Sequence, residues 1–216
     1  MRYDNITKAV FINRPNRFIA NVDINGRSET VHVKNTGRCK ELLIPGCEVW
    51  LTAPDSPGRK IKYDLVAVRK STGILFNIDS QAPNKVVKEW LEGEGYDKVI
   101  PEYTYGASRI DFYMEKGSEK YLMEVKGCTL EENGIGYFPD APTERGVKHI
   151  HELIAARKAG CNAILAFVIQ MDGVSEVRAN VATHPEFGTA LDDAVKAGVE
   201  VKFLKCHVEP DMLEIL

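Results

Sequence analysis

Several features that would assign this chain to a familiar class are missing from its sequence. It has no run of about 18 apolar residues, and its first residues lack the apolar segment of a secretory signal, so we expect a cytoplasmic protein without a membrane span. The five cysteines are odd in number and never spaced C-x-x-C, which argues against a disulfide framework or a zinc knuckle. The patterns G-x-x-x-x-G-K-[ST] and G-x-G-x-x-G are both missing, so no nucleotide cofactor is expected.

The composition is that of a globular chain with an uneven charge distribution. Of its 216 residues 44% are hydrophobic and 27% are charged, which is enough to bury a core. Residues 1–80 contain 13 Lys and Arg against 8 Asp and Glu, a net charge of +5, whereas residues 81–216 contain 15 against 23, a net charge of −8. The first part therefore predicts a polyanion-binding surface and the second a place for cations, although chance clustering on a solvated surface gives the same totals.

The residue pattern changes near residue 80, and we predict one domain over residues 1–80 and another over residues 81–216. In the first, Asn25-Gly26 is the pair that a tight hairpin turn prefers. Short segments between turn residues predict strands of a small barrel or sandwich at 17–24, 28–33, 47–52, 63–69 and 73–78.

In the second domain, apolar residues at helical spacing around 86–91 predict a helix, and a mixture of strands and helices follows. Strands are predicted at 101–105, 108–114, 120–128, 162–169 and 199–206, and helices at about 144–159 and 185–197.

The segments 108–114 and 120–128 predict a β-hairpin that brings two acidic residues together. If its turn centres between residues 117 and 118, residues whose numbers sum to 235 face one another, and Asp111 lies opposite Glu124. Alternation then places Arg109 and Lys126 on the same charged face. The opposite face is predicted to contain Ile110, Phe112, Met114, Tyr121, Met123 and Val125.

Two carboxylates in this arrangement predict a metal site. With Cβ atoms roughly 5 Å apart, Asp111 and Glu124 repel each other unless a cation lies between them. Mg²⁺ is typically held by one or two carboxylates together with water and substrate phosphate, so we expect Mg²⁺ or Mn²⁺ here. Lys126 can then orient or acidify an attacking water. The alternative is a surface ladder of Asp, Glu and Lys joined by a simple salt bridge, because E-x-K is common in strands.

These residues resemble known families. Asp111 with Glu124-Val125-Lys126 resembles the D…(D/E)-x-K signature of the PD-(D/E)XK nuclease superfamily, and the predicted order of helices and strands is similar to its core. Over nearly the whole chain, five blocks in order resemble the sugar fermentation stimulation protein A family. They are Arg14-Pro15-Asn16-Arg17-Phe18, Asn35-Thr36-Gly37-Arg38, Ser108-Arg109-Ile110-Asp111-Phe112, Glu124-Val125-Lys126, and Phe138-Pro139-Asp140-Ala141 with Arg145-Gly146.

The resemblance implies an α/β chain, α+β overall, with an OB-fold-like N-terminal β-barrel and a restriction-endonuclease-like mixed-sheet domain that together bind DNA. It also implies that Asp111, Glu124 and the Val125 carbonyl hold the metal and that Lys126 is the catalytic lysine. The chain departs from the superfamily in that Ile110, not proline, precedes Asp111. A further acidic ligand is common in the superfamily. The candidates here are Glu89 and Glu102, each equally an ordinary surface acid.

Other polar residues are predicted to assist. Arg145 and His149 lie one turn apart on the helix that begins near residue 144, and with Lys148 they can meet a phosphate beside the metal; Arg145 and His149 are predicted to take part in catalysis. In the first domain, basic residues interleave with Phe11 and Phe18, as in barrels that bind nucleic acid, although both aromatics are equally expected in the core. The predicted nucleic-acid-binding residues are Arg14, Arg17, Lys34, Asn35, Arg38, Lys40, Arg109 and Lys148.

Two functions follow as hypotheses. The first is a DNA-binding protein with a metal-dependent nuclease site that hydrolyses phosphodiester bonds. The alternative is a non-catalytic DNA-binding regulatory protein that affects sugar metabolism genes, as the family's name suggests. Both predict a nucleic-acid partner, most of all DNA, and both leave the oligomeric state open.

Overall fold

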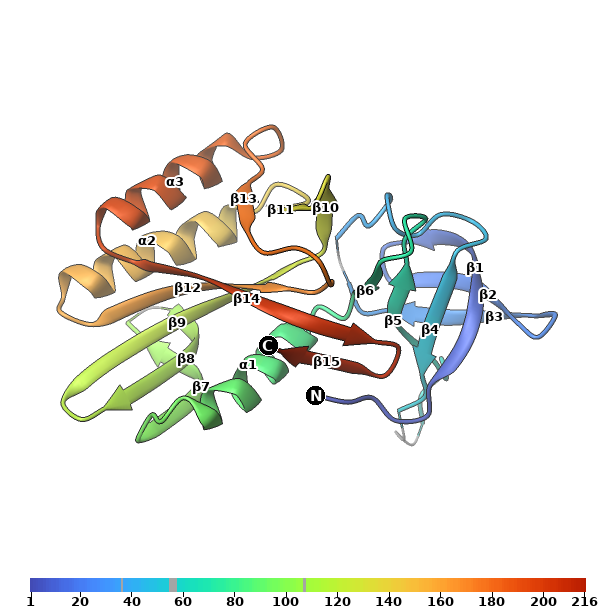
Figure 1. The fold of residues 1–216 in the computed structure, drawn as a ribbon, viewed down its shortest axis with the longest axis horizontal. Coiled ribbons are helices and arrows are strands. Elements are labelled where there is room, and N and C mark those ends of the chain that lie inside the picture. The colour runs from blue at the N-terminus through green and yellow to red at the C-terminus, as the bar shows by residue number, and fades with distance from the viewer. Residues whose placement is uncertain (36, 55–57, 107) are drawn as a thin grey trace.

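The chain folds into two lobes that lie side by side (Figure 1). The computed structural model describes residues 1–35, 37–54, 58–106 and 108–216. Thr36 of the Asn35-Thr36-Gly37-Arg38 block and residues 55–57, where a turn was expected, lie outside these ranges.

The first lobe is a small β-barrel. A parallel pairing of β3 with β5 closes strands β1 to β5 into the barrel, with the order β3-β2-β1-β4-β5-β6, which confirms the OB-like expectation. Asn25 and Gly26 have φ values of 53° and 82°, the positive values that the predicted hairpin turn requires. The strands are β1 (Thr7–Asn16), β2 (Ile19–Ile24), β3 (Arg27–Val33), β4 (Glu48–Thr52), β5 (Asp64–Arg69) and β6 (Leu75–Asn77).

Strand β1 was not predicted from the sequence. Its inward residues Ala9 and Phe11 are buried, but the outward residues Val10 and Ile12 are apolar as well, with 42% and 37% of each exposed. Because both faces of this strand are apolar, the alternation that marks a half-buried strand is missing.

The second lobe is a six-stranded mixed sheet with helices on both faces (Figure 1). Its elements are α1 (Ala82–Gly93), β7 (Lys98–Tyr105), β8 (Ser108–Lys116), β9 (Glu119–Cys128), α2 (Glu144–Lys158), β12 (Asn162–Ile169), α3 (Pro185–Lys196), β14 (Glu200–Glu209) and β15 (Met212–Ile215). The order is β15-β14-β12-β9-β8-β7, with β9, β12 and β14 parallel. Helix α1 covers one face, and α2 and α3 cover the other.

The predicted helices and strands of this lobe are all present, and β12 begins and ends where the sequence predicts. Strand β15 was missed, as were β10 (Leu130–Glu132), β11 (Ile135–Phe138) and β13 (Val177–Ala179), which form a separate small sheet. Strands of three or four residues are too short to show a clear alternation.

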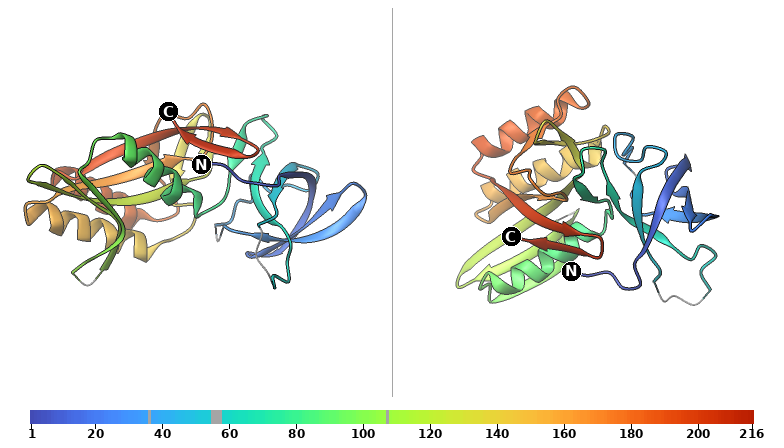
Figure 2. Two further views of the ribbon diagram at one scale, coloured as in Figure 1. Left: turned by 90° about the horizontal axis from the view of Figure 1, so that it is seen from below. Right: turned by 45° about the vertical axis from the view of Figure 1, so that its right-hand side comes forward.

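Buried polar contacts join the two lobes. From the end of β12, Gln170 donates through Nε2 to Asn77 Oδ1 at 2.9 Å and to the Asp79 carbonyl at 3.1 Å. Lys70 Nζ lies 2.6 Å from Glu131 Oε2. Both chain ends also lie near this junction (Figure 2). Among the described residues no helix is long and apolar enough to cross a membrane.

Candidate active site

The hairpin of β8 and β9 has the predicted register, because every pair in it has residue numbers that sum to 235. The regular pairing ends at Phe112 and Met123, one step before Asp111 and Glu124. Beyond that point, the Val125 backbone N–H donates to Asp111 Oδ2 at 2.8 Å. The two carboxylates therefore lie where the regular ladder stops and side-chain contacts replace it.

The alternation of faces is interrupted at the same place. Ile110 packs in the hydrophobic cluster that contains Tyr113 and Leu122, whereas Phe112 and Met114 belong to the cluster beneath α1. The predicted position of Ile110 on the same face as Phe112 is wrong, because regular two-residue alternation does not continue through Asp111.

Glu124 is a buried carboxylate with only 2% of the residue exposed. Its Oε1 accepts hydrogen bonds from Lys126 Nζ and from Nδ1 of His149 on α2, while its Oε2 has no hydrogen-bond partner among the described residues. Burial by itself raises the pKa of a carboxyl group, but His149 and Lys126 outweigh it and hold the pKa of Glu124 below its ordinary value. Glu124 is thus ionised, and its Oε2 is available to bind a cation.

His149 holds Glu124 in place. Arg145 Nε donates to His149 Nε2 at 3.3 Å, so Nε2 accepts a hydrogen bond and the ring proton is on Nδ1, which faces Glu124. His149 is buried, whereas Arg145 is exposed at the start of α2. The geometry gives His149 a positioning role and leaves Arg145 at the surface, where its charge can meet a substrate.

Asp111 completes the pair of carboxylates. Its Oδ1 accepts a hydrogen bond of 2.7 Å from Nδ2 of Asn84 on α1, and its Oδ2 accepts from the Val125 amide. Burial, and after it the charge of Glu124, raise the pKa of Asp111. Asn84 was not predicted as a site residue, and its one signal in the sequence is a polar residue in the first turn of an otherwise apolar helix face.

These donors fit a divalent cation. The charge of Glu124 contributes to the raised pKa of Asp111, so the two carboxylates interact, and Glu124 Oε2 is buried without a hydrogen-bond partner among the described residues. A divalent cation would offset this negative charge. No group of three or more His, Cys, Asp and Glu side chains in the described ranges forms a complete metal-binding cluster. Water, substrate oxygens or the predicted Val125 carbonyl would therefore have to complete the coordination.

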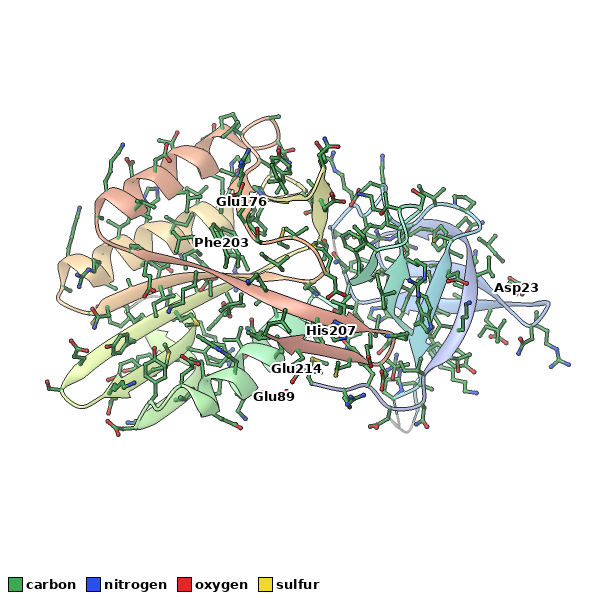
Figure 3. All side chains as sticks on the ribbon, in the orientation of Figure 1. Asp23, Glu89, Glu176, Phe203, His207 and Glu214 are labelled. Atoms are coloured by element: carbon green, nitrogen blue, oxygen red, sulfur yellow. The ribbon has the colours of Figure 1, made fainter. Side chains whose placement is uncertain are left out.

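The other predicted acids and bases of this lobe have partners elsewhere. Glu89 lies 2.7 Å from the N-terminal amine, near that chain end (Figure 3). Glu102 pairs with Arg109, and both are exposed. Lys148 Nζ lies 3.6 Å from Glu152 Oε1 along α2. In the described contacts, none of these four side chains touches Asp111 or Glu124.

Three of the predicted nucleic-acid-binding residues of the barrel have internal partners. The Arg14 guanidinium donates to the backbone carbonyls of residues 17, 35, 37 and 38 at distances of 2.6 to 2.9 Å. Lys34 Nζ lies 3.0 Å from the buried Asp79, and Asn35 Nδ2 donates to the Ile78 carbonyl at 2.9 Å. These residues build the barrel edge and the turn beside it.

Arg17, Arg38 and Lys40 are exposed, and no carboxylate in the described part of the chain forms an ion pair with them. They line a groove of about 480 Å³ that extends to Ala141 of the second lobe. We call this the basic groove. Phe11 is in the core, with 2% exposed, whereas 46% of Phe18 is exposed beside the groove residue Arg17.

Comparison with known proteins gives concordant matches. Residues 12–78 match the family described as SfsA N-terminal OB domain, and residues 81–212 match the sugar fermentation stimulation protein RE domain. A sugar fermentation stimulation protein homolog of Desulfitobacterium hafniense strain DCB-2 is 51% identical over 218 residues, covering 99% of this chain and 95% of its own. A homolog from Clostridium beijerinckii is 52% identical over 219 residues, covering 100% and 96%. The structure of Pyrococcus furiosus SfsA in complex with Ca²⁺ matches with a TM-score of 0.87 and 29% identity, covering 100% of this chain and 96% of that one.

Proposed function

The chain belongs to the sugar fermentation stimulation protein family, and from that premise and the site geometry we propose that it is a nucleic-acid-binding phosphodiesterase that requires a divalent cation. We propose DNA as its substrate. The observation that carries the proposal is the pair of carboxylates Asp111 and Glu124, with Lys126 beside them and one Glu124 oxygen that is buried and has no hydrogen-bond partner in the described part of the chain.

Asp111 and Glu124 would hold Mg²⁺ or Mn²⁺, with the Val125 carbonyl as a further ligand. The bound ion would supply Lewis acidity and would offset the negative charge that develops on the phosphate. That the Pyrococcus furiosus relative was solved with Ca²⁺ supports an oxygen-rich site for a divalent ion in this family.

The side chains around the carboxylates have separate tasks. The Lys126 ammonium, of whose side chain 13% is exposed, orients the attacking water and contributes positive charge next to the scissile phosphate. His149 donates to Glu124 Oε1 and so keeps Oε2 free. Arg145, exposed in the first turn of α2, can bind a phosphate oxygen. Asn84 fixes the orientation of Asp111.

The basic groove supports a nucleic-acid substrate. Arg17, Arg38 and Lys40 offer three charges that are not neutralised by neighbouring carboxylates of the described residues, and phosphate neutralisation by such side chains provides most of the affinity for nucleic acid. The groove extends from the barrel to Ala141, near the N-terminus of α2. The barrel would thus hold the strand while the second lobe cuts it.

The test is cleavage of end-labelled single-stranded, duplex and branched DNA by wild type and Asp111→Asn, each with Mg²⁺, with Mn²⁺ and with EDTA. We expect cuts only with metal, and a loss in Asp111→Asn greater than the roughly 10- to 100-fold that removal of an outer metal-site residue costs. DNA affinity in EDTA should stay within about two-fold of wild type, since Asp111 is not in the basic groove. Asp23→Asn, at the far end of the barrel (Figure 3), is the control. Equal cleavage by wild type and Asp111→Asn would refute the nuclease.

A second function is favoured by one observation, the basic groove with the exposed residues Arg17, Arg38 and Lys40, because such a groove can bind nucleic acid without a metal. On this hypothesis the protein is a DNA-binding regulator without catalytic activity, and the second lobe is a scaffold. It predicts salt-sensitive DNA binding that weakens in Arg17→Ala and Arg38→Ala, and no cleavage with any divalent ion.

A further inference from the structure

Phe18 is an exposed aromatic side chain in a rigid turn between β1 and β2. With 46% of the residue exposed, it is more accessible than Phe203, the other strongly exposed phenylalanine of the described chain, at 39%. A large aromatic side chain gains free energy by burial, so a ligand that covers the exposed part of this ring would gain that free energy on binding.

Hydrogen bonds fix the peptides on both sides of Phe18. Asn16 Oδ1 accepts hydrogen bonds from the backbone N–H groups of Phe18 at 2.9 Å and Ile19 at 3.1 Å. The Phe18 carbonyl accepts from the Val33 N–H at 2.7 Å, and the Arg17 carbonyl accepts from Arg14 at 2.7 Å. The ring is therefore presented by a preorganised turn, which reduces the entropy cost of binding something against it.

One cation lies over the Phe18 ring. The guanidinium carbon of Arg17 lies 4.8 Å from the ring centroid of Phe18, and the same side chain lines the basic groove with Arg38 and Lys40. An aromatic face next to a row of unneutralised cations is the combination that binds single-stranded nucleic acid, since the cations contact phosphates and the ring stacks on a base. In a duplex, neighbouring base pairs cover both faces of each base.

The basic groove that Arg17 lines extends from the barrel to Ala141 of the second lobe. Gly37 lines both the basic groove and a second cavity of about 140 Å³ between the lobes, which is also lined by Gly127, the residue after Lys126. The Arg38 N–H donates to Asp140 Oδ2 at 3.0 Å and so joins the groove to the second lobe.

We propose that Phe18 is a stacking platform for an unpaired base, and that the protein binds a single-stranded segment along the basic groove. This inference rests on the proposed function only in taking nucleic acid as the ligand. It assigns the barrel a preference for single strands that does not depend on whether the second lobe cleaves.

The test is equilibrium binding in EDTA, measured by fluorescence anisotropy with labelled oligo(dT), an abasic strand of the same length, and a duplex. Phe18→Ala and Phe18→Leu should each weaken oligo(dT) binding about 5- to 150-fold, the range expected for loss of one base–aromatic stack. Phe18→Trp should keep the affinity. Binding of the abasic strand and of the duplex should change by less than about two-fold, since neither offers a base to stack on.

Phe203→Ala is the matched control, because it removes an exposed phenylalanine from β14 of the sheet lobe (Figure 3). Unchanged oligo(dT) affinity in Phe18→Ala, an equal loss with the abasic strand, or no binding of oligo(dT) by wild type would each overturn the platform. The cleavage test on Asp111→Asn is separate. If Phe18 contributes to binding but no DNA is cleaved, the stacking platform is supported and the nuclease is refuted. If DNA is cleaved but substitution of Phe18 has no effect on binding, the nuclease is supported and the stacking platform is refuted.

Discussion

Lys70 and Glu131 form an ion pair whose loss should lower the stability of the fold strongly, because the pair is buried at the junction of the lobes. Lys70 Nζ lies 2.6 Å from Glu131 Oε2 and 3.0 Å from the Glu131 carbonyl, and the side chains are 16% and 6% exposed. Replacing Lys70 with methionine keeps the chain length but leaves a buried carboxylate without its cation. Breaking such a pair costs roughly 3–5 kcal/mol, and we expect about 3 kcal/mol because Lys70 retains some contact with water.

The measurement is thermal and urea unfolding of Lys70→Met. For a chain of this size, about 3 kcal/mol corresponds to a drop in Tm of roughly 6–12 °C. The matched control is Lys196→Met, since Lys196 and its partner Asp193 are 76% and 52% exposed and such pairs contribute about 0–1 kcal/mol. The double variant Lys70→Met/Glu131→Gln should recover most of the loss, because no buried charge remains and Gln can still accept from the Gly134 N–H. A Tm for Lys70→Met equal to that of Lys196→Met would refute the reasoning.

Three further predictions concern the same junction and site. The pKa of Glu131 is lowered, because its bonds to Lys70 and Gly134 outweigh burial. Its contribution to stability is therefore present above about pH 4.5 and is lost as the pH falls below that value. In Glu131→Gln, the free energy of unfolding should change less with pH over this range than in wild type. His149→Ala should cost about 1–3 kcal/mol and lower cleavage, because Glu124 loses a buried donor, and His149→Asn should recover part of both. Gly37→Ala would place a Cβ 2.2 Å from Asp140 Oδ2, so unfolding experiments should show a loss of about 1–3 kcal/mol together with weaker DNA binding.

The sequence predicts local pairing well and contacts between distant segments poorly. The register of β8 and β9 follows from the turn length and the alternation of a single hairpin, so the proximity of Asp111 and Glu124 could be predicted from the sequence. The donation from Asn84 to Asp111 and from His149 to Glu124 depends on how α1 and α2 pack on the sheet, across 27 and 25 residues. Neither helix pattern specifies which polar side chain faces a given strand residue.

The charge of a side chain is a poor guide to its function when its hydrogen-bond partners are backbone carbonyl groups. Arg14 was grouped with Arg17 and Arg38 because all three are basic and close in sequence, yet its guanidinium is used by four carbonyl groups of two neighbouring turns. A residue count cannot distinguish an arginine that binds a phosphate from one that satisfies buried carbonyls, because both need a cation with several donors.

The hydrogen bonds of Arg14 to backbone carbonyl groups link the proposed nucleic-acid binding to the proposed cleavage. The same guanidinium fixes the turn that presents Phe18 and the turn that contains Arg38, whose N–H bonds Asp140 just before α2. Helix α2 then carries His149 to Glu124. The exposed ring and the buried carboxylate are therefore connected through consecutive hydrogen-bonded elements, and a strand held by the barrel has a fixed position relative to the carboxylates. Loss of Arg14 should thus weaken DNA binding and also lower cleavage at saturating DNA, whereas loss of Arg17 should weaken binding and leave cleavage at saturating DNA unchanged.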